Sequence, residues 1–232
     1  MLVSAFPAAA FATNCYVVAP GERQECVVVD PGIGVLDRLA DVLQRHGLRP
    51  AAVLLTHGHL DHVYSVTPVC GGHGIPALVH GDDRYRLADP LATLDPGLLA
   101  MLEAQFGRSA QWAEPGDVRA VVDAEVLEVA GLTLRVLHAP GHTEGSVMFA
   151  LPGAPDGVEA GSTVLSGDVL FAGSIGRTDL PGGDMAAMVA SLRDKVLTLP
   201  DDAYVLPGHG PATTLAHERA TNPYLLQVAE HR

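Results

Sequence analysis

The sequence is poor in positive charge. Its 232 residues contain 14 Lys and Arg against 27 Asp and Glu, a formal net charge of −13 with histidine neutral. Lys195 is the only lysine. A chain of this charge repels phosphate backbones, so we expect no nucleic-acid partner and disfavour RNA processing.

Cysteines and long apolar runs are also scarce. Cys15, Cys26 and Cys70 are an odd number without C-x-x-C spacing, which argues against a disulfide framework and predicts a reducing, cytoplasmic setting. No apolar run approaches the roughly 20 residues that span a bilayer. The apolar N-terminus has no basic residue before Pro7, so we expect neither a signal peptide nor a membrane partner.

The chain does have a regular alternation of strand and helix patterns. Short runs rich in valine and bounded by Gly, Pro or Asn predict strands at 2–6, 15–18, 26–29, 53–55, 120–122, 125–129, 132–137, 146–151, 163–166 and 204–206. Apolar residues at three- and four-residue steps predict helices from 35 to a stop at Gly47, weakly at 83–107, and at 185–197 and 213–220. This order predicts an α/β fold in one domain, residues 1–232, arranged as a four-layered αββα sandwich.

One heptad concentrates potential metal ligands. In "THGHLDH", residues 56–62, His57 and His59 are two apart on a loop that we expect to be exposed, where an extended backbone turns both to one side. Asp61 and His62 follow where the next helix begins. A catalytic ion takes about three protein ligands and leaves a position for water, so the heptad alone cannot complete two sites.

Three later loops supply the missing ligands. His142 lies in "APGHTEGS", Asp168 in "LSGDVLF" and His209 in "LPGHGP". Each loop has the same layout of apolar run, glycine turn and ligand. Glycine permits close backbone approach to an ion, and loops held at strand ends can converge on one point.

The four motifs "THGHLDH", "PGHTEGS", "GD" and "PGHG", in this order, resemble the metallo-β-lactamase superfamily, whose fold is the αββα sandwich. The resemblance implies that His57, His59 and His142 hold one ion and that Asp61, His62 and His209 hold the other. Asp168 would bridge both ions, which makes Asp61 and Asp168 the catalytic carboxylates. Five imidazoles and two carboxylates suit two divalent ions of zinc, or of iron or manganese, better than Mg²⁺ or Ca²⁺.

Two longer stretches narrow the resemblance to one branch. "GDVLFAGSIGRTDLPGGD" and "PGHGPATTLAHERATNPYL" are similar to the short members of the glyoxalase II branch. That implies hydrolysis of a small thioester, S-2-hydroxyacylglutathione, to a 2-hydroxy acid and free thiol by attack of a metal-bridging hydroxide. Longer members carry a C-terminal helical domain that contacts glutathione, and this chain ends soon after His209. Mycothiol and bacillithiol therefore stay open as alternative thiols.

The main alternative is a persulfide dioxygenase, a relative that shares the "GRTD" loop. It would use one Fe(II) held by His57, His142 and Asp168, the two-His and one-carboxylate set of oxygen chemistry. The presence of Asp61, His62 and His209 favours two ions and hydrolysis. Hydrolysis of β-lactams ranks lower, because the "GSIGRTDLPGG" loop does not resemble the substrate loops of those families.

Two further residues have candidate roles. Asp30, in "VVDPG", is either a simple turn residue or a residue that holds the ligands without binding the metal itself. Arg177 lies in a glycine-rich loop that should overhang the site, where it would pair with a substrate carboxylate. The remaining histidines are expected to be structural: His46, His73, His80, His138, His217 and His231.

Overall fold

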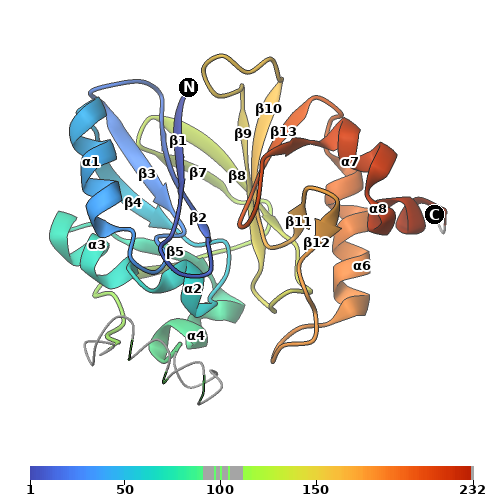
Figure 1. The fold of residues 1–232 in the computed structure, drawn as a ribbon, viewed down its shortest axis with the longest axis horizontal. Coiled ribbons are helices and arrows are strands. Elements are labelled where there is room, and N and C mark those ends of the chain that lie inside the picture. Colours follow the sequence, from blue (N-terminus) through green and yellow to red (C-terminus); the bar gives the residue numbers. More distant parts are fainter. Residues whose placement is uncertain (91–96, 98–99, 101–103, 105–111, 231–232) are drawn as a thin grey trace.

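The computed structural model describes residues 1–90, 97, 100, 104 and 112–230. Two six-stranded sheets pack face to face, with α1 and α3 outside the first sheet and α6, α7 and α8 outside the second (Figure 1). The arrangement is the four-layered α/β sandwich that the sequence predicts. No helix among the described residues is both long and apolar enough to cross a membrane.

The first sheet changes from antiparallel to parallel along its length. Its order is β1 (Leu2–Pro7), β2 (Asn14–Ala19), β3 (Glu25–Val29), β4 (Arg49–Leu54), β5 (Ala77–His80) and β6 (Val118–Val121). The first three strands pair antiparallel, and β3 to β6 pair parallel. Parallel neighbours need crossover connections, which contain α1 (Leu36–His46), α2 (Leu60–Val63), α3 (Val66–His73), η1 (Gly81–Asp83) and α4 (Arg84–Ala88).

The second sheet is mostly antiparallel. Its order is β14 (Thr213–Thr214), β13 (Ala203–Pro207), β10 (Ser162–Gly167), β9 (Val147–Pro152), β8 (Leu132–His138) and β7 (Val126–Val129). Only β10 and β13 pair parallel, and α6 (Met185–Asp194) and η2 (Val196–Thr198) lie in their connection. A short hairpin of β11 (Leu170–Phe171) and β12 (Ser174–Ile175) precedes α6, and α7 (Leu215–Thr221) and α8 (Pro223–Glu230) end the chain.

Three apolar layers hold the four structural layers together. Strand β4 shows why its apolar run is continuous: Val53 packs toward α1 and α3, while Leu54 packs between the two sheets. A strand covered on both faces needs apolar residues at every position. Phe149 lies in the layer between the sheets, and Met188 packs in the layer between the second sheet and its helices.

The structure corrects the predicted C-terminus. Residues 213–214 form β14 instead of helix, and the helix predicted at 213–220 is α7, Leu215–Thr221, which is followed by a further helix, α8, that the sequence does not predict. Proline fits the first turn of a helix, and the Asn222 side chain accepts a hydrogen bond from Tyr224 N at 3.1 Å, as a helix N-cap does.

Other parts of the prediction were incomplete. The sequence does not predict α3, which contains a proline and two glycines and forms because Val66, Val69 and Cys70 pack into the first layer. The sequence does not predict β5 either. Of the helical segment expected at 83–107, the structure describes α4, and most of the remainder lies outside the described residues. Helix α1 does end at Gly47, in the left-handed conformation that glycine favours.

Candidate metal centre

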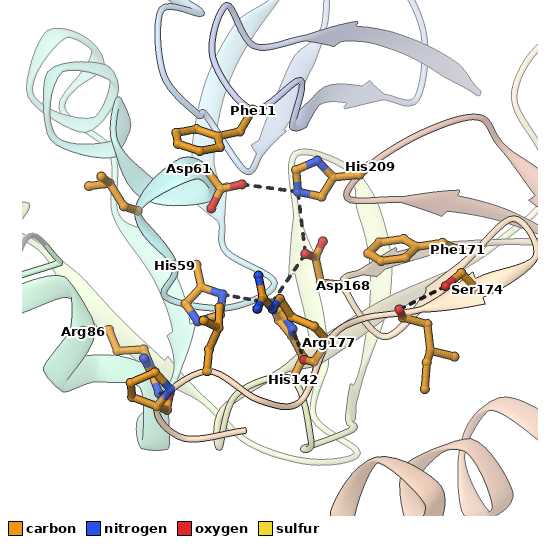
Figure 2. Close-up of a pocket in the computed structure, with 14 residues that line it drawn as sticks. Phe11, His59, Asp61, Arg86, His142, Asp168, Phe171, Ser174, Arg177 and His209 are labelled. Carbon is orange, nitrogen blue, oxygen red and sulfur yellow. Dashed lines mark hydrogen bonds and ion pairs between the residues drawn. The ribbon is translucent and has the colours of Figure 1, made fainter. Parts of the chain in front are cut away.

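The proposed ligands come from the ends of strands in both sheets. The heptad follows β4 of the first sheet, and His142, Asp168 and His209 follow β8, β10 and β13 of the second. Figure 2 shows His59, Asp61, His142, Asp168 and His209 around one pocket. The expected exposure of the heptad loop is wrong, because His57 is only 1% exposed.

Three imidazole nitrogens form the first group. His57 Nε2 lies 3.1 Å from His59 Nδ1, which lies 2.9 Å from His142 Nε2, and the two Nε2 atoms are 3.2 Å apart. The rings meet edge to edge, with interplanar angles of 79° to 88°. Such spacing is compatible with one ion at the usual Zn–N distance of about 2.0 to 2.1 Å.

Asp61, His62 and His209 form the second group. Asp61 Oδ2 lies 3.5 Å from His62 Nε2 and 3.2 Å from His209 Nε2, and the two nitrogens are 3.3 Å apart. Asp168 lies between the groups, because Oδ2 is 3.4 Å from His142 Nε2 and Oδ1 is 3.4 Å from His62 Nε2. The structure therefore brings all seven candidate ligands together.

Outer hydrogen bonds fix which nitrogen faces inward in three of the rings, those of His57, His62 and His142. The Thr56 hydroxyl donates to Asp30 Oδ2 at 2.7 Å, so it accepts the His57 Nδ1 proton at 3.1 Å. His62 Nδ1 donates to Asp30 Oδ2 at 2.9 Å, and His142 Nδ1 donates to the Arg177 carbonyl at 2.8 Å. Metal-binding histidines commonly have such partners, which orient the ring and leave Nε2 as the ligand atom.

These contacts explain Asp30. Its side chain is buried, its φ is 49°, and it also accepts a hydrogen bond from Thr56 N at 2.9 Å. It supports His62 directly and His57 through Thr56, which favours the second of the two roles weighed from the sequence.

The inward-facing atoms fit a cation. With their Nδ1 protons directed outward, His57 and His142 place two Nε2 lone pairs 3.2 Å apart. Asp168 Oδ1 is buried and has no hydrogen-bond partner in the structure. Lone pairs and an unpaired buried carboxylate oxygen cost free energy unless a positive charge lies between them. Imidazole and carboxylate donors together suit zinc or iron.

The histidines of the two ligand groups differ in their pKa values and therefore in their charge. Burial and the neighbouring histidines lower the pKa of His59 to about 3 and lower that of His57, which leaves both neutral and able to bind metal. Burial also lowers the pKa of His62, but Asp61, Asp168 and Asp30 outweigh it and raise that pKa to about 10. Burial raises the pKa of Asp168. The three carboxylates around His62 thus favour a positive charge in the second group, whereas His57 and His59 of the first group are neutral.

Glycines allow the close approach that the sequence predicts. A Cβ atom at Gly208 would lie 2.8 Å from His62 Cε1, and one at Gly176 would lie 3.1 Å from His142 Nδ1. Any larger residue at either position would push a ligand ring aside.

A pocket of about 610 Å³ opens beside the ligands (Figure 2). Phe11 and Phe171 line it together with the loop residues Ile175 and Leu180. The glycine-rich loop therefore borders the site as expected. The side chain of Arg177 also lines the pocket, but it is 61% exposed and binds Asp179 through two contacts of 2.7 Å.

Some residues near the site have no motif that would reveal them. Thr13 is fully buried and donates to Asp61 Oδ2 at 2.7 Å, and its backbone forms a β-bridge with His209. Asp83 and Arg86 contact the ligand loops from η1 and α4. The signal that could have located Asp83 is its place just after the apolar run of β5.

His80, Asp82 and His138 form a further group of potential ligands outside the pocket. The two imidazole rings are stacked, with centroids 3.9 Å apart and an angle of 11° between them. The in-plane lone pairs of stacked rings lie in separate, nearly parallel planes and do not meet at one ion. We assign no metal to this group.

Comparison with known proteins adds independent information. The family model described as "Metallo-beta-lactamase superfamily" matches residues 8–209. The chain is 42% identical to an uncharacterised protein of Mycobacterium tuberculosis and 34% identical to hydroxyacylglutathione hydrolase GloC of Haemophilus influenzae. Each alignment covers 97% of this chain and 98% of the relative.

Two solved structures are also similar. The BLEG-1 B3 metallo-β-lactamase has a TM-score of 0.78 and 37% identity over 97% of this chain and 99% of that one. The di-iron-bound form of TTHA1623 has a TM-score of 0.75 and 36% identity over 96% of this chain and 100% of that one.

Proposed function

This chain belongs to the metallo-β-lactamase superfamily, and from that premise we propose that it hydrolyses thioesters with two bound divalent ions. The observation that carries the proposal is the arrangement of ligands: two groups of three, with Asp168 within 3.4 Å of a histidine in each. The di-iron form of TTHA1623, at 36% identity, supports two ions. Zinc is the proposed metal, with iron or manganese as alternatives.

Two such ions would supply Lewis acidity toward a carbonyl and an activated water. The chain's own residues would bind the ions and hold the ligand side chains in position. Asp61, whose pKa the histidines and Thr13 lower against the effect of burial, stays ionised as a ligand. The Asp30 carboxylate and the Arg177 carbonyl hold the rings of His62 and His142, so that the ligands need little reorganisation.

The pocket supports a small thioester as substrate. Its volume suits a small organic molecule, and apolar side chains line much of it. Besides the candidate ligands, its titratable lining residues in the described part of the chain are Arg86 and Arg177. Neither is a general acid near neutral pH, so the pocket suits a leaving group such as thiolate that needs no proton.

Similarity to GloC supports a hydroxyacyl thioester as the specific substrate, because that relative is named as a hydroxyacylglutathione hydrolase. We propose Arg177 as a contact for a substrate carboxylate, which would have to compete with Asp179. The three buried, unpaired cysteines are compatible with a reducing cytoplasmic location.

Two observations favour other chemistry. BLEG-1, named as a B3 metallo-β-lactamase, is 37% identical to this chain, which makes a β-lactam a second candidate substrate. His57, His142 and Asp168 also lie close enough for a single Fe(II) site, with contacts of 3.2 and 3.4 Å, as a persulfide dioxygenase would need. The complete second group favours hydrolysis.

The test combines metal analysis with a substrate panel. Purified protein should contain about two ions per chain and release thiol from S-lactoylglutathione or a related hydroxyacyl thioester, without consuming oxygen when given a persulfide. His59→Ala should abolish release. One iron per chain with persulfide-dependent oxygen uptake would establish the dioxygenase instead, and cleavage of a β-lactam without any thioester would establish a lactamase.

A further inference from the structure

A carboxylate outside the ligand set connects two of the ligand loops. Asp83 ends η1 and is fully buried. Its Oδ2 accepts hydrogen bonds from Gly58 N and Thr143 Oγ1, both at 2.7 Å, and its Oδ1 accepts one from Gly145 N at 2.8 Å. An ionised carboxylate with several donors makes strong hydrogen bonds, so these distances are firmly held.

Two of the three donors lie directly beside ligands, and the third, Gly145, lies three residues after His142. Gly58 separates His57 from His59, and Thr143 follows His142. The heptad loop belongs to the first sheet and the His142 loop to the second, so Asp83 joins parts of the chain that the sheets alone do not join. A change in its contacts would alter the 2.9 to 3.2 Å spacing of the first nitrogen group.

Arg86 lies on the next turn and holds the glycine-rich loop in addition to the His142 loop. Its side chain is 2% exposed, and Nη2 donates to Glu144 Oε2 at 2.6 Å and to the Pro181 carbonyl at 2.8 Å. Pro181 belongs to the glycine-rich loop and lines the pocket, as Arg86 does. Arg86 Nε lies 3.4 Å from Asp83 Oδ1, which places both residues in one charged cluster.

We propose that η1 and α4 carry two positioning residues with separate tasks: Asp83 sets the geometry of the His57, His59 and His142 group, and Arg86 holds the substrate loop against it. The inference rests on the proposed two-ion site. Asp83 does not line the pocket, and its hydrogen bonds go to the ligand loops, so it acts through those loops. Partners that hold metal ligands in this way typically change metal affinity about 10- to 100-fold when removed.

The first test is Asp83→Asn in the full-length protein. An asparagine places an NH₂ group against Gly58 N and Thr143 Oγ1 or against Gly145 N, so at least one hydrogen bond is lost. In a Zn²⁺ titration against a competing chelator, one of the two ions should bind about 10- to 100-fold more weakly, with the other within about twofold.

Asp82→Asn is the matched control, since Asp82 is the exposed neighbour of Asp83 and contacts His80 instead of the ligand loops. It should leave both affinities unchanged. Equal weakening of both ions, or of neither, in Asp83→Asn would overturn the assignment. Thr143→Val removes one of the three hydrogen bonds and should give a smaller loss at the same ion, which decides the question if Asp83→Asn does not fold.

Arg86→Lys tests the second task. Lysine keeps the charge but cannot reach both Glu144 and the Pro181 carbonyl with the planar guanidinium geometry. Hydrogen exchange of the amides at 176–183 should become faster, with Zn²⁺ affinity unchanged and KM for a thioester raised about tenfold at similar kcat. Arg84→Lys, which alters an exposed ion pair with Glu114, is the control.

Loss of metal in Arg86→Lys, or unchanged exchange at 176–183, would contradict the division of tasks. The titration and the exchange measurement need no turnover. A protein that hydrolyses no thioester would therefore refute the proposed function while these two measurements still decide the roles of Asp83 and Arg86.

Discussion

At the scale of single residues, the metal centre depends on side chains that hold the ligands. Asp30 orients two histidines, and Thr13 donates to Asp61 Oδ2 at 2.7 Å from a buried position on a different segment. Each is a short side chain at the end of a hydrogen bond that only the folded chain can form. Their removal should therefore affect one ion group at a time.

Thr13→Val should weaken the ion of the second group about tenfold, because the isosteric valine keeps the packing but removes the hydrogen bond to Asp61. A Zn²⁺ titration against a competing chelator measures this change in affinity. Thr163→Val is a matched control, since Thr163 is equally buried and loses a hydrogen bond to the Gly153 carbonyl far along the sheet. Similar losses of affinity in both variants would show that Thr13 has no specific role.

At the scale of elements, the hairpin β11–β12 forms one wall of the pocket and is held by α7. Asn222 Nδ2 donates to the Ser174 carbonyl at 3.1 Å, and Glu218 accepts from Gly173 N at 2.8 Å. Glu218 also accepts from Thr213 Oγ1 at 2.6 Å, so this carboxylate joins the hairpin to the segment after His209.

Glu218→Gln should cost about 1 to 3 kcal/mol of unfolding free energy at pH 7, because it weakens buried hydrogen bonds to a charge. Burial raises the pKa of Glu218, but the hydrogen bonds from Thr213, Asn222 and Gly173 outweigh it and lower the pKa below its ordinary 4.5. The ionised group thus stabilises the fold above about pH 4.5, and its contribution is lost as pH falls through the folded-state value.

The difference between wild type and Glu218→Gln should therefore shrink in acid. Urea unfolding of both metal-free proteins at pH 7 and near pH 3 measures this difference in unfolding free energy. Glu230→Gln, an exposed position on α8, should match wild type at both pH values. A difference that stays constant with pH would mean that the Glu218 charge does not matter.

At the scale of the whole molecule, the metal centre joins two sheets. His57, His59, Asp61 and His62 follow a strand of the first sheet, whereas His142, Asp168 and His209 follow strands of the second. Ions bound by these residues would therefore cross-link the two halves of the sandwich in addition to the apolar layer between them. Ions that bind only the folded state stabilise it by mass action.

Removal of the metal should lower the melting temperature. At a free ion concentration of 100 Kd, one site contributes about 2.7 kcal/mol, which for a chain of this size corresponds to roughly 5 to 10 °C. Calorimetry measures the melting temperature of the protein as purified, after chelation, and after Zn²⁺ is restored. A melting temperature that does not respond to Zn²⁺ would contradict the cross-link.

Much of the fold was predictable because local patterns determined it. Valine-rich runs marked most strands, and Gly47 marked the end of α1. Helix α3 was missed because its proline and glycines disfavour a helix in isolation, and packing of Val66, Val69 and Cys70 outweighs that preference. The start of α8 was missed because a proline can either end one helix or begin the next.

The sequence by itself determined the ligand types, because four motifs place histidine or aspartate after strand-like runs and glycine turns, and donor chemistry belongs to side chains. Only the tertiary structure decided which nitrogen of each ring faces inward and which residues hold the ligands. Thr13, Asp83 and Glu218 lie 48, 60 and 45 residues from the groups they bind, and such contacts leave no local pattern. They exist because the folded sheets, and the helices and loops packed on them, bring distant parts of the chain to one place.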